Sequence, residues 1–165
     1  VNGLAVRARI SPTLNMTISG SGILDLGTLS SSAYSTGTVS IEVGTNAVNG
    51  SSITARSTNG GLQNASNATV YLNNLVADEV ADSYRFTSAI DAAEDSAYSS
   101  FTQSATLAAE VSDNTTNHVL YTSNKPQALS VGTDDILFSV STKPDAQSPA
   151  GDYSDVVVVT VTGNF

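Results

Sequence analysis

The chain ends in the stretch Ser148-Pro149-Ala150-Gly151-Asp152-Tyr153-Ser154-Asp155-Val156-Val157-Val158-Val159-Thr160-Val161-Thr162-Gly163-Asn164-Phe165. Its Pro and Gly residues favour a turn, and the β-branched residues that follow favour an extended strand. Because side chains alternate across a strand, Tyr153 and every second valine from Val157 to Val161 occupy one face. The sequence therefore predicts a final strand whose apolar face has to be covered by another layer.

The same two-residue period runs through most of the chain, which is typical of β-strands. It is clear in residues 39–43, 119–121 and 136–140, and we also expect a short strand at 23–27. Turn residues separate the segments at a spacing typical of sandwiches. We therefore predict an all-β protein, an Ig-like or jelly-roll β-sandwich of about ten strands. At most one short helical turn is expected, in the Ala- and acid-rich residues 88–97.

A second alternating segment opens the chain. Its apolar face carries Leu4, Val6, Ala8 and Ile10. Pro12 interrupts this segment, as Pro does in strands, and the same alternation resumes beyond it. We divide the chain into an N-terminal extended segment, residues 1–18, and a single β-sandwich domain, residues 19–165. The segment has to pair either with its own domain or with a neighbouring subunit.

The composition argues against several classes of function. The net charge is −9, with only six scattered Lys and Arg residues, so no basic patch for nucleic acid is expected. An anionic membrane surface would repel such a chain. The chain has one His and no Cys, whereas a zinc site needs several such ligands. No nucleophile motif accompanies His118. We expect no enzyme activity, no metal ion and no cofactor.

Acidic residues gather at 78–82, 91–95 and 134–135. Oxygen-rich loops of this kind bind calcium in some surface domains. None of the three matches a calcium-loop pattern. A solvated acidic surface is therefore the preferred interpretation, with calcium as the alternative.

The sequence also contains Asn-x-Ser/Thr sequons. They lie at Asn15, Asn49, Asn64, Asn67 and Asn114. Chance accounts for several in a chain so rich in these residues. Asn64 and Asn67 are the loop-like candidates for glycosylation.

Residues 148–162 resemble the C-terminal strand of bacterial pilin-like domains, which typically read Pro-Ala-Gly-x-Tyr-x-Asp followed by alternating Val and Thr. Spore-coat-U-type pilins and other donor-strand-complemented pilins look similar here. Residues 24–29, Leu-Asp-Leu-Gly-Thr-Leu, and residues 43–46, Val-Gly-Thr-Asn, are similar to segments of WxL-like surface domains. The chain departs from many of these pilins in having no Cys.

The resemblance implies a structural role outside the cell. In such fibres the terminal segment of one subunit completes the sheet of the next, and the head-to-tail contact propagates as a filament. The resemblance makes Leu4, Val6, Ala8 and Ile10 the side chains of the joint and copies of the chain the partners. A start at Val1 rather than Met fits a removed signal peptide.

We therefore expect a secreted, extracellular or cell-surface subunit of a pilus, fimbria or similar filament. The sequence leaves its role open between cell adhesion, motility and the matrix of a biofilm. The alternative is a monomeric adhesin or carbohydrate-binding β-sandwich on the cell surface. That function would need a localised aromatic face or a calcium site. The chain has no Trp, and its six Tyr residues are dispersed along the sequence.

Overall fold

The structure is a computed structural model, and it describes residues 7–73, 82–90, 101–102, 109–127 and 136–165. Within these ranges the regular secondary structure is all strand, so the predicted all-β fold is confirmed. The strands are β1 (Leu14–Ile18), β2 (Ser35–Thr45), β3 (Ser51–Ser57), β4 (Leu62–Asn64), β5 (Tyr71–Leu72), β6 (Ser83–Ile90), β7 (Phe101–Thr102), β8 (Ala109–Glu110), β9 (His118–Ser123), β10 (Ile136–Lys143), β11 (Tyr153–Ser154) and β12 (Val157–Gly163). The expected helical turn at 88–97 lies outside the described residues except for its first three, which end β6.

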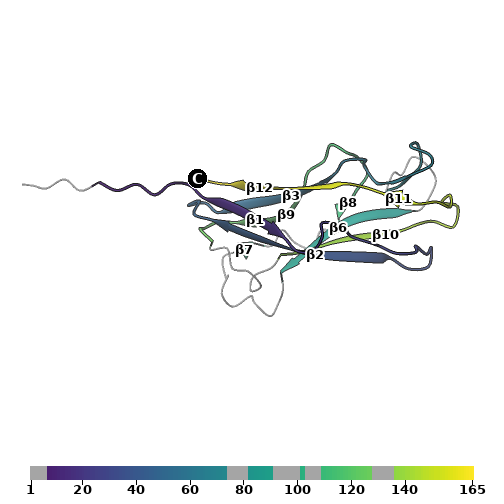
Figure 1. The fold of residues 1–165 in the computed structure, drawn as a ribbon, viewed down its shortest axis with the longest axis horizontal. Coiled ribbons are helices and arrows are strands. Elements are labelled where there is room, and N and C mark those ends of the chain that lie inside the picture. The colour runs from purple at the N-terminus through teal and green to yellow at the C-terminus, as the bar shows by residue number, and fades with distance from the viewer. Residues whose placement is uncertain (1–6, 74–81, 91–100, 103–108, 128–135) are drawn as a thin grey trace, which may run out of the picture.

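All described strand pairs are antiparallel, and they form two main layers and a small third sheet. One layer has the order β1-β2-β10-β6-β8 and the other has the order β12-β3-β9-β7. The third sheet, β11-β4-β5, lies at the end of the molecule where β12 begins. Figure 1 shows β12 and β3 above β2 and β10, which is the arrangement of a sandwich.

The core lies between the two layers and follows from the alternation of each strand. Ile41 of β2, Ile53 of β3 and Phe86 of β6 are completely buried. The Phe86 ring contacts Tyr84 and Phe138 edge-on, at centroid distances of 5.5 and 5.4 Å. Edge-to-face packing of this kind stabilises aromatic clusters beyond simple burial. The core around Phe86 is therefore completely covered, and we call it the closed side of the sandwich.

The C-terminus is tied to the turn between β2 and β3. Asn164 N donates to Gly50 O at 2.9 Å, and Asn49 N donates to Asn164 O at 3.0 Å. Gly50 has φ +71°, and a Cβ there would lie 2.4 Å from the backbone of Ser123, so only glycine fits. These contacts fix the end of β12 against the body.

Residues 14–18 belong to the body, because β1 pairs with β2 over its whole length. The described part of the N-terminal segment that lies outside the sheets is therefore residues 7–13. Residues 23–27, expected to form a short strand, pair with no other strand in the described ranges. Asp25 Oδ1 instead accepts a hydrogen bond from Gly27 N at 2.8 Å, which turns the chain locally.

Candidate functional site

The described N-terminal segment, residues 7–13, projects from the body. Every one of these residues is exposed, and Ile10 is 86% exposed. Figure 1 shows the segment leaving the end of the sandwich that also carries the C-terminus. An isoleucine held in water at the end of an extended chain is unfavourable by about 1.5–3 kcal/mol relative to burial. This segment is thus the clearest candidate for contact with another surface.

The root of the segment is fixed by Asn46, which follows β2. Thr13 N donates to Asn46 Oδ1 at 2.7 Å, and Asn46 Nδ2 donates to Ser11 O at 2.8 Å. The hydroxyl of Thr45 also donates to Thr13 O, at 3.1 Å. Pro12 lacks a backbone N–H and so cannot extend the β1 ladder. The chain is therefore held as far as Ser11 and released beyond it. Sequence reasoning did not assign this role to Thr45 or Asn46.

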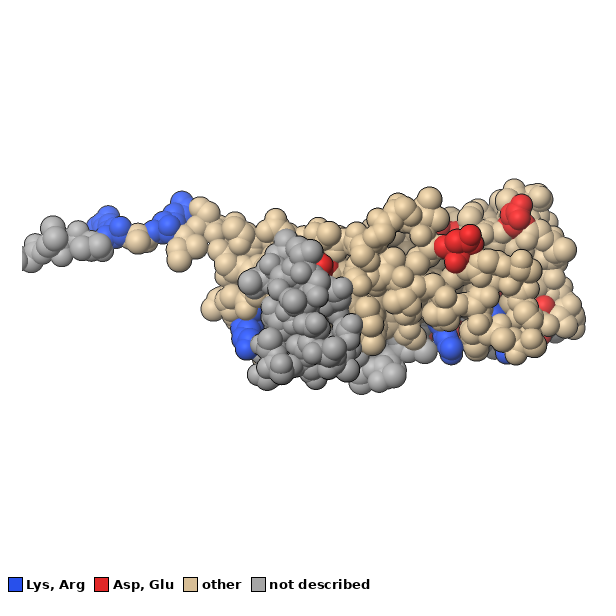
Figure 2. Space-filling view, turned by 60° about the horizontal axis from the view of Figure 1, so that its bottom comes forward, with Lys and Arg blue, Asp and Glu red and all other residues tan. Residues whose placement is uncertain are grey.

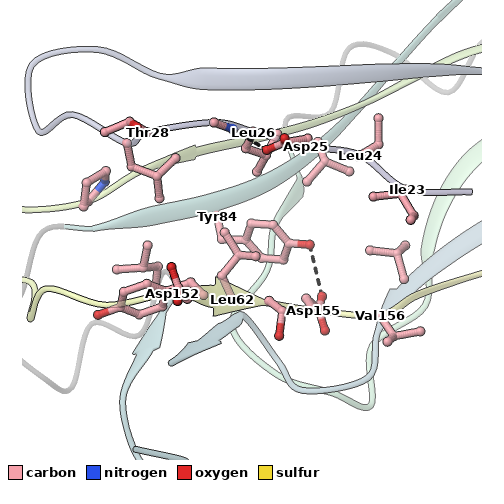
Figure 3. A pocket seen from close by; sticks show the side chains of 18 of the residues that line it. Ile23, Leu24, Asp25, Leu26, Thr28, Leu62, Tyr84, Asp152, Asp155 and Val156 are labelled. Atoms are coloured by element: carbon pink, nitrogen blue, oxygen red, sulfur yellow. Dashed lines mark hydrogen bonds between the residues drawn. The ribbon is translucent and has the colours of Figure 1, made fainter. Parts of the chain in front are cut away.

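A long groove opens between two segments of the body. Residues 22–29 line one side, residues 148–157 line the other, and the groove has a volume of about 1080 Å³. Figure 3 shows Leu24 and Leu26 on one side, with Asp152 and Val156 opposite them. Pockets for small ligands occupy about 300–1,000 Å³, so this groove has room for an extended peptide.

The first side of the groove rests on β2. The side chains of Leu24 and Leu26 are half-buried and pack on the core. A Cβ at Gly37 would approach their Cδ2 atoms to 3.1 and 3.2 Å, so the leucines lie directly over a glycine backbone. Ile23, beside them, is 76% exposed. An apolar lining of this kind remains uncovered in the isolated chain.

Tyr84 lies at the floor of the groove, hydrogen-bonded to Asp155. The Tyr84 hydroxyl donates to Asp155 Oδ2 at 3.0 Å (Figure 3). Asn59 N donates to the other carboxylate oxygen, Asp155 Oδ1, at 3.2 Å. Burial, reinforced by the charge of Asp155 and by the hydrogen bond, raises the pKa of Tyr84 far above its ordinary value. Tyr84 is therefore a neutral donor that stiffens the floor, not a titrating group.

The groove is flanked by β12, which is an edge strand. Residues of an antiparallel strand alternate between those bonded to the partner and those whose backbone groups point away. Thr58 N, just after β3, donates a hydrogen bond to Val156 O, and Asn164 N donates to Gly50 O. The backbone groups of the even-numbered residues of β12 therefore face β3. The backbone groups of Val157, Val159 and Val161 consequently point outward, where no described strand lies.

The opposite layer also ends in an edge on this side of the sandwich. The backbones of Thr13 and Ser19 bond to β2, so those of Leu14, Met16 and Ile18 point outward. β1 and β12 come within 8 Å of each other, and Figure 1 shows them side by side near the C-terminus. Among the described strands, one side of the sandwich is therefore bounded by two edge strands with apolar inward faces. Such unpaired edges are templates for another chain.

The structure describes some of the joint residues predicted from the sequence and not others. Leu4 and Val6 lie outside the described residues. Ala8 and Ile10 lie in the projecting segment and are exposed.

The two glycosylation candidates differ in exposure. Asn64 is 5% exposed, and its Oδ1 accepts hydrogen bonds from Ser66 N and Asn67 N. A Cβ at Gly151 would lie 2.6 Å from Asn64 Nδ2, so the amide is packed against that turn. Asn67 is exposed. Only Asn67 of the pair therefore offers its amide to a modifying enzyme.

Other candidate chemistry is sparse in the part of the chain that the structure describes. No cluster of His, Cys, Asp or Glu able to hold a metal ion occurs there. Of the predicted acidic clusters, Asp82 alone is described; it is buried, and Asn73 N donates to it at 3.3 Å. His118 packs edge-on against Phe86. Nor does a helix capable of crossing a bilayer occur in the described ranges.

Comparison with known proteins gives no identification. No family model, no curated protein and no solved structure matches this chain.

Proposed function

We propose that this protein is the structural subunit of an extracellular filament, in which the N-terminal segment of one copy completes the open side of the next. The observation that supports the proposal is that two complementary parts of the chain are left uncovered. A segment that carries the exposed Ile10 projects into water, and one side of the sandwich has two edges with no described strand beside them and a groove lined in part by leucines and valines. Strand addition satisfies both, since it pairs the edge and buries the side chains.

The two features lie toward opposite ends of the molecule. The segment leaves beside the C-terminus, whereas the groove extends to the residues around β11 at the other end (Figure 1). A contact between unlike surfaces is heterologous and repeats from copy to copy, so it builds a fibre rather than a closed dimer.

Negative-stain electron microscopy of the wild-type chain tests the proposal. We expect fibres with a repeat of one domain, whereas discrete monomers alone would contradict it and favour the monomeric adhesin. Ile10→Asp should abolish the fibres because a carboxylate cannot enter an apolar groove without a large desolvation penalty. Val48→Asp is the matched control: Val48 is 66% exposed and does not line the groove. It should leave the fibres intact.

A further inference from the structure

We propose that the projecting segment is a processing site, at which an arginine-specific endopeptidase cuts the bonds Arg9–Ile10 and Arg7–Ala8 and spares the folded body. The site follows from the structure of the isolated chain. Its consequence for assembly rests on the proposed function.

The six Lys and Arg residues of the chain all lie within the described ranges. Arg7 and Arg9 belong to the projecting segment, and the other four belong to the body. The stretches of chain outside the described ranges contain no Lys or Arg. A protease that needs a cation immediately before the cleaved bond therefore has all of its sites at positions whose surroundings are known.

The Arg9–Ile10 bond lies in a part of the chain that a protease can bind. An extended peptide is recognised through its backbone hydrogen bonds and alternate side chains, and a protease cleft holds its substrate in this way. Residues 7–12, three on each side of the bond, are exposed and lie outside the strands. Figure 2 shows blue side chains on this segment, clear of the body. Ser11 O accepts only an exposed hydrogen bond from Asn46 Nδ2, which water or a protease can replace.

The two other arginines lie within paired strands. Arg56 of β3 is paired with Val158 of β12, and its guanidinium donates to Asn114 O at 2.7 Å. Arg85 of β6 lies between β10 and β8, and its guanidinium carbon is 3.8 Å from the centre of the Tyr34 ring. A paired strand cannot enter a protease cleft, so either bond is reached only after local or global unfolding.

Both lysines of the chain precede proline. The pairs are Lys125-Pro126 and Lys143-Pro144. Proline fixes φ, lacks an N–H and crowds the residue before it. A trypsin-type protease, which cuts after Lys as well as Arg, therefore does not cut these bonds, even though Lys125 is exposed. Only the projecting segment combines exposure with a cleavable bond.

The cut is a hydrolysis that needs only water. Water adds across the peptide bond, which leaves a carboxylate on Arg9 and an amino group on Ile10. Leu4, Val6 and Ala8, three of the four side chains predicted for the joint, leave with the released peptide. β1 remains in the body, because it is paired with β2 over its whole length.

The cut chain differs from the whole chain in one half of the proposed joint. It has lost the segment that the proposed function gives to the next copy, and it has kept the groove. It should therefore accept a segment without donating one, and so terminate a growing fibre. Processing then limits the length of the fibres.

Limited digestion of the dilute, folded chain with trypsin tests the site. Intact-mass spectrometry should show loss of residues 1–9, directly or by way of a chain that lacks residues 1–7, while the body from Ile10 to Phe165 persists. The matched variant R7Q/R9Q should survive about a thousandfold longer or more. Its remaining sites require unfolding, and the unfolded fraction of a typical protein is about 10⁻³ to 10⁻⁶.

A digestion in urea, at a concentration that unfolds the chain and leaves trypsin active, is the control for the protease. Both proteins should then also be cut after Arg56 and Arg85. In the folded chain, an early cut at Arg56, Arg85, Lys125 or Lys143 would overturn the proposal. So would a wild-type chain that resists trypsin for as long as R7Q/R9Q does.

Fibres separate the processing site from the proposed function. Within wild-type fibres the segment should be cut more slowly than in the dilute chain, and added cut chain should shorten the fibres. Equal cutting in fibres and in dilute chain would contradict the joint and leave the processing site standing. Fibres built from a chain that trypsin leaves whole in dilute solution would overturn the processing site and leave the filament standing.

Discussion

β3 and β12 are neighbours with the same alternation but very different burial. Along β3 the inward residues are buried, and Ile53 and Ala55 are completely so. Along β12 the inward residues from Val157 to Val161 are only half-buried. β3 has strands on both edges, whereas β12 has a strand on only one edge among the residues that the structure describes. β12 has the same core-forming alternation as β3, and its lower burial goes with the lack of a second neighbour among the described strands.

The largest expected effect on the free energy of unfolding comes from truncating one side chain on the closed side and one on the open side. Phe86→Ala should destabilise the unassembled chain by about 3–5 kcal/mol, because a completely buried ring is replaced by a cavity. Val159→Ala should lower the free energy of unfolding by only about 1 kcal/mol, since little apolar surface is lost there.

Urea denaturation of dilute protein measures both variants. The dissociation temperature of the fibres is then measured for both variants. Val159→Ala should destabilise the fibres much more than it destabilises the isolated chain. Equal damage in both states would show that the face of β12 is not covered on assembly.

The sequence predicted much of this architecture and less of the site. The alternation of residues 39–43 and 136–140 is enough to predict the strands and their inward faces, because the period of side-chain direction is local. Of the predicted N-terminal segment, residues 1–18, the structure describes residues 7–18, and the last five of these form β1.

The groove itself could not be predicted. Residues 23–27 alternate like a strand, yet they find no strand partner in the described ranges and lie over Gly37 instead. Which strands become edges depends on pairings between distant segments, and no local pattern encodes them. The same holds for the contact between Tyr84 and Asp155, which are far apart in sequence.

An intermediate effect is expected at the floor of the groove. Tyr84→Phe removes the hydrogen bond to Asp155 and should destabilise the chain by about 1.5–3 kcal/mol, the range for bonds to charged groups. Tyr153→Phe is the matched control: its hydroxyl donates to Pro149 O in an exposed bond. It should change stability by less than about 0.5 kcal/mol. Thermal denaturation of both variants measures the stability that each hydroxyl contributes. A large loss for Tyr84→Phe alone would show that the floor of the groove contributes to stability as the closed side does.

The smallest expected effect is a pH dependence confined to the closed side. Burial lowers the pKa of His118 from its ordinary value of 6.5, and the charge of Asp113 opposes this only in part. The unfolded chain therefore binds a proton at a higher pH than the folded chain does. Stability should fall as the pH drops from about 6.5 through the lowered pKa of His118, and should be fully regained above 6.5.

Asp113 responds in a separate range of pH. Hydrogen bonds from Thr116 and Thr115 hold the pKa of its carboxylate far below the ordinary value, so its contribution is lost only below about pH 4. His118→Gln should therefore flatten the unfolding free energy near pH 6 without changing the acid limb. Because His118 packs against Phe86 and does not line the groove, the step near pH 6 should be the same in dilute chains and in fibres. A step that disappears on assembly would place His118 at the joint and remove the distinction between the two sides.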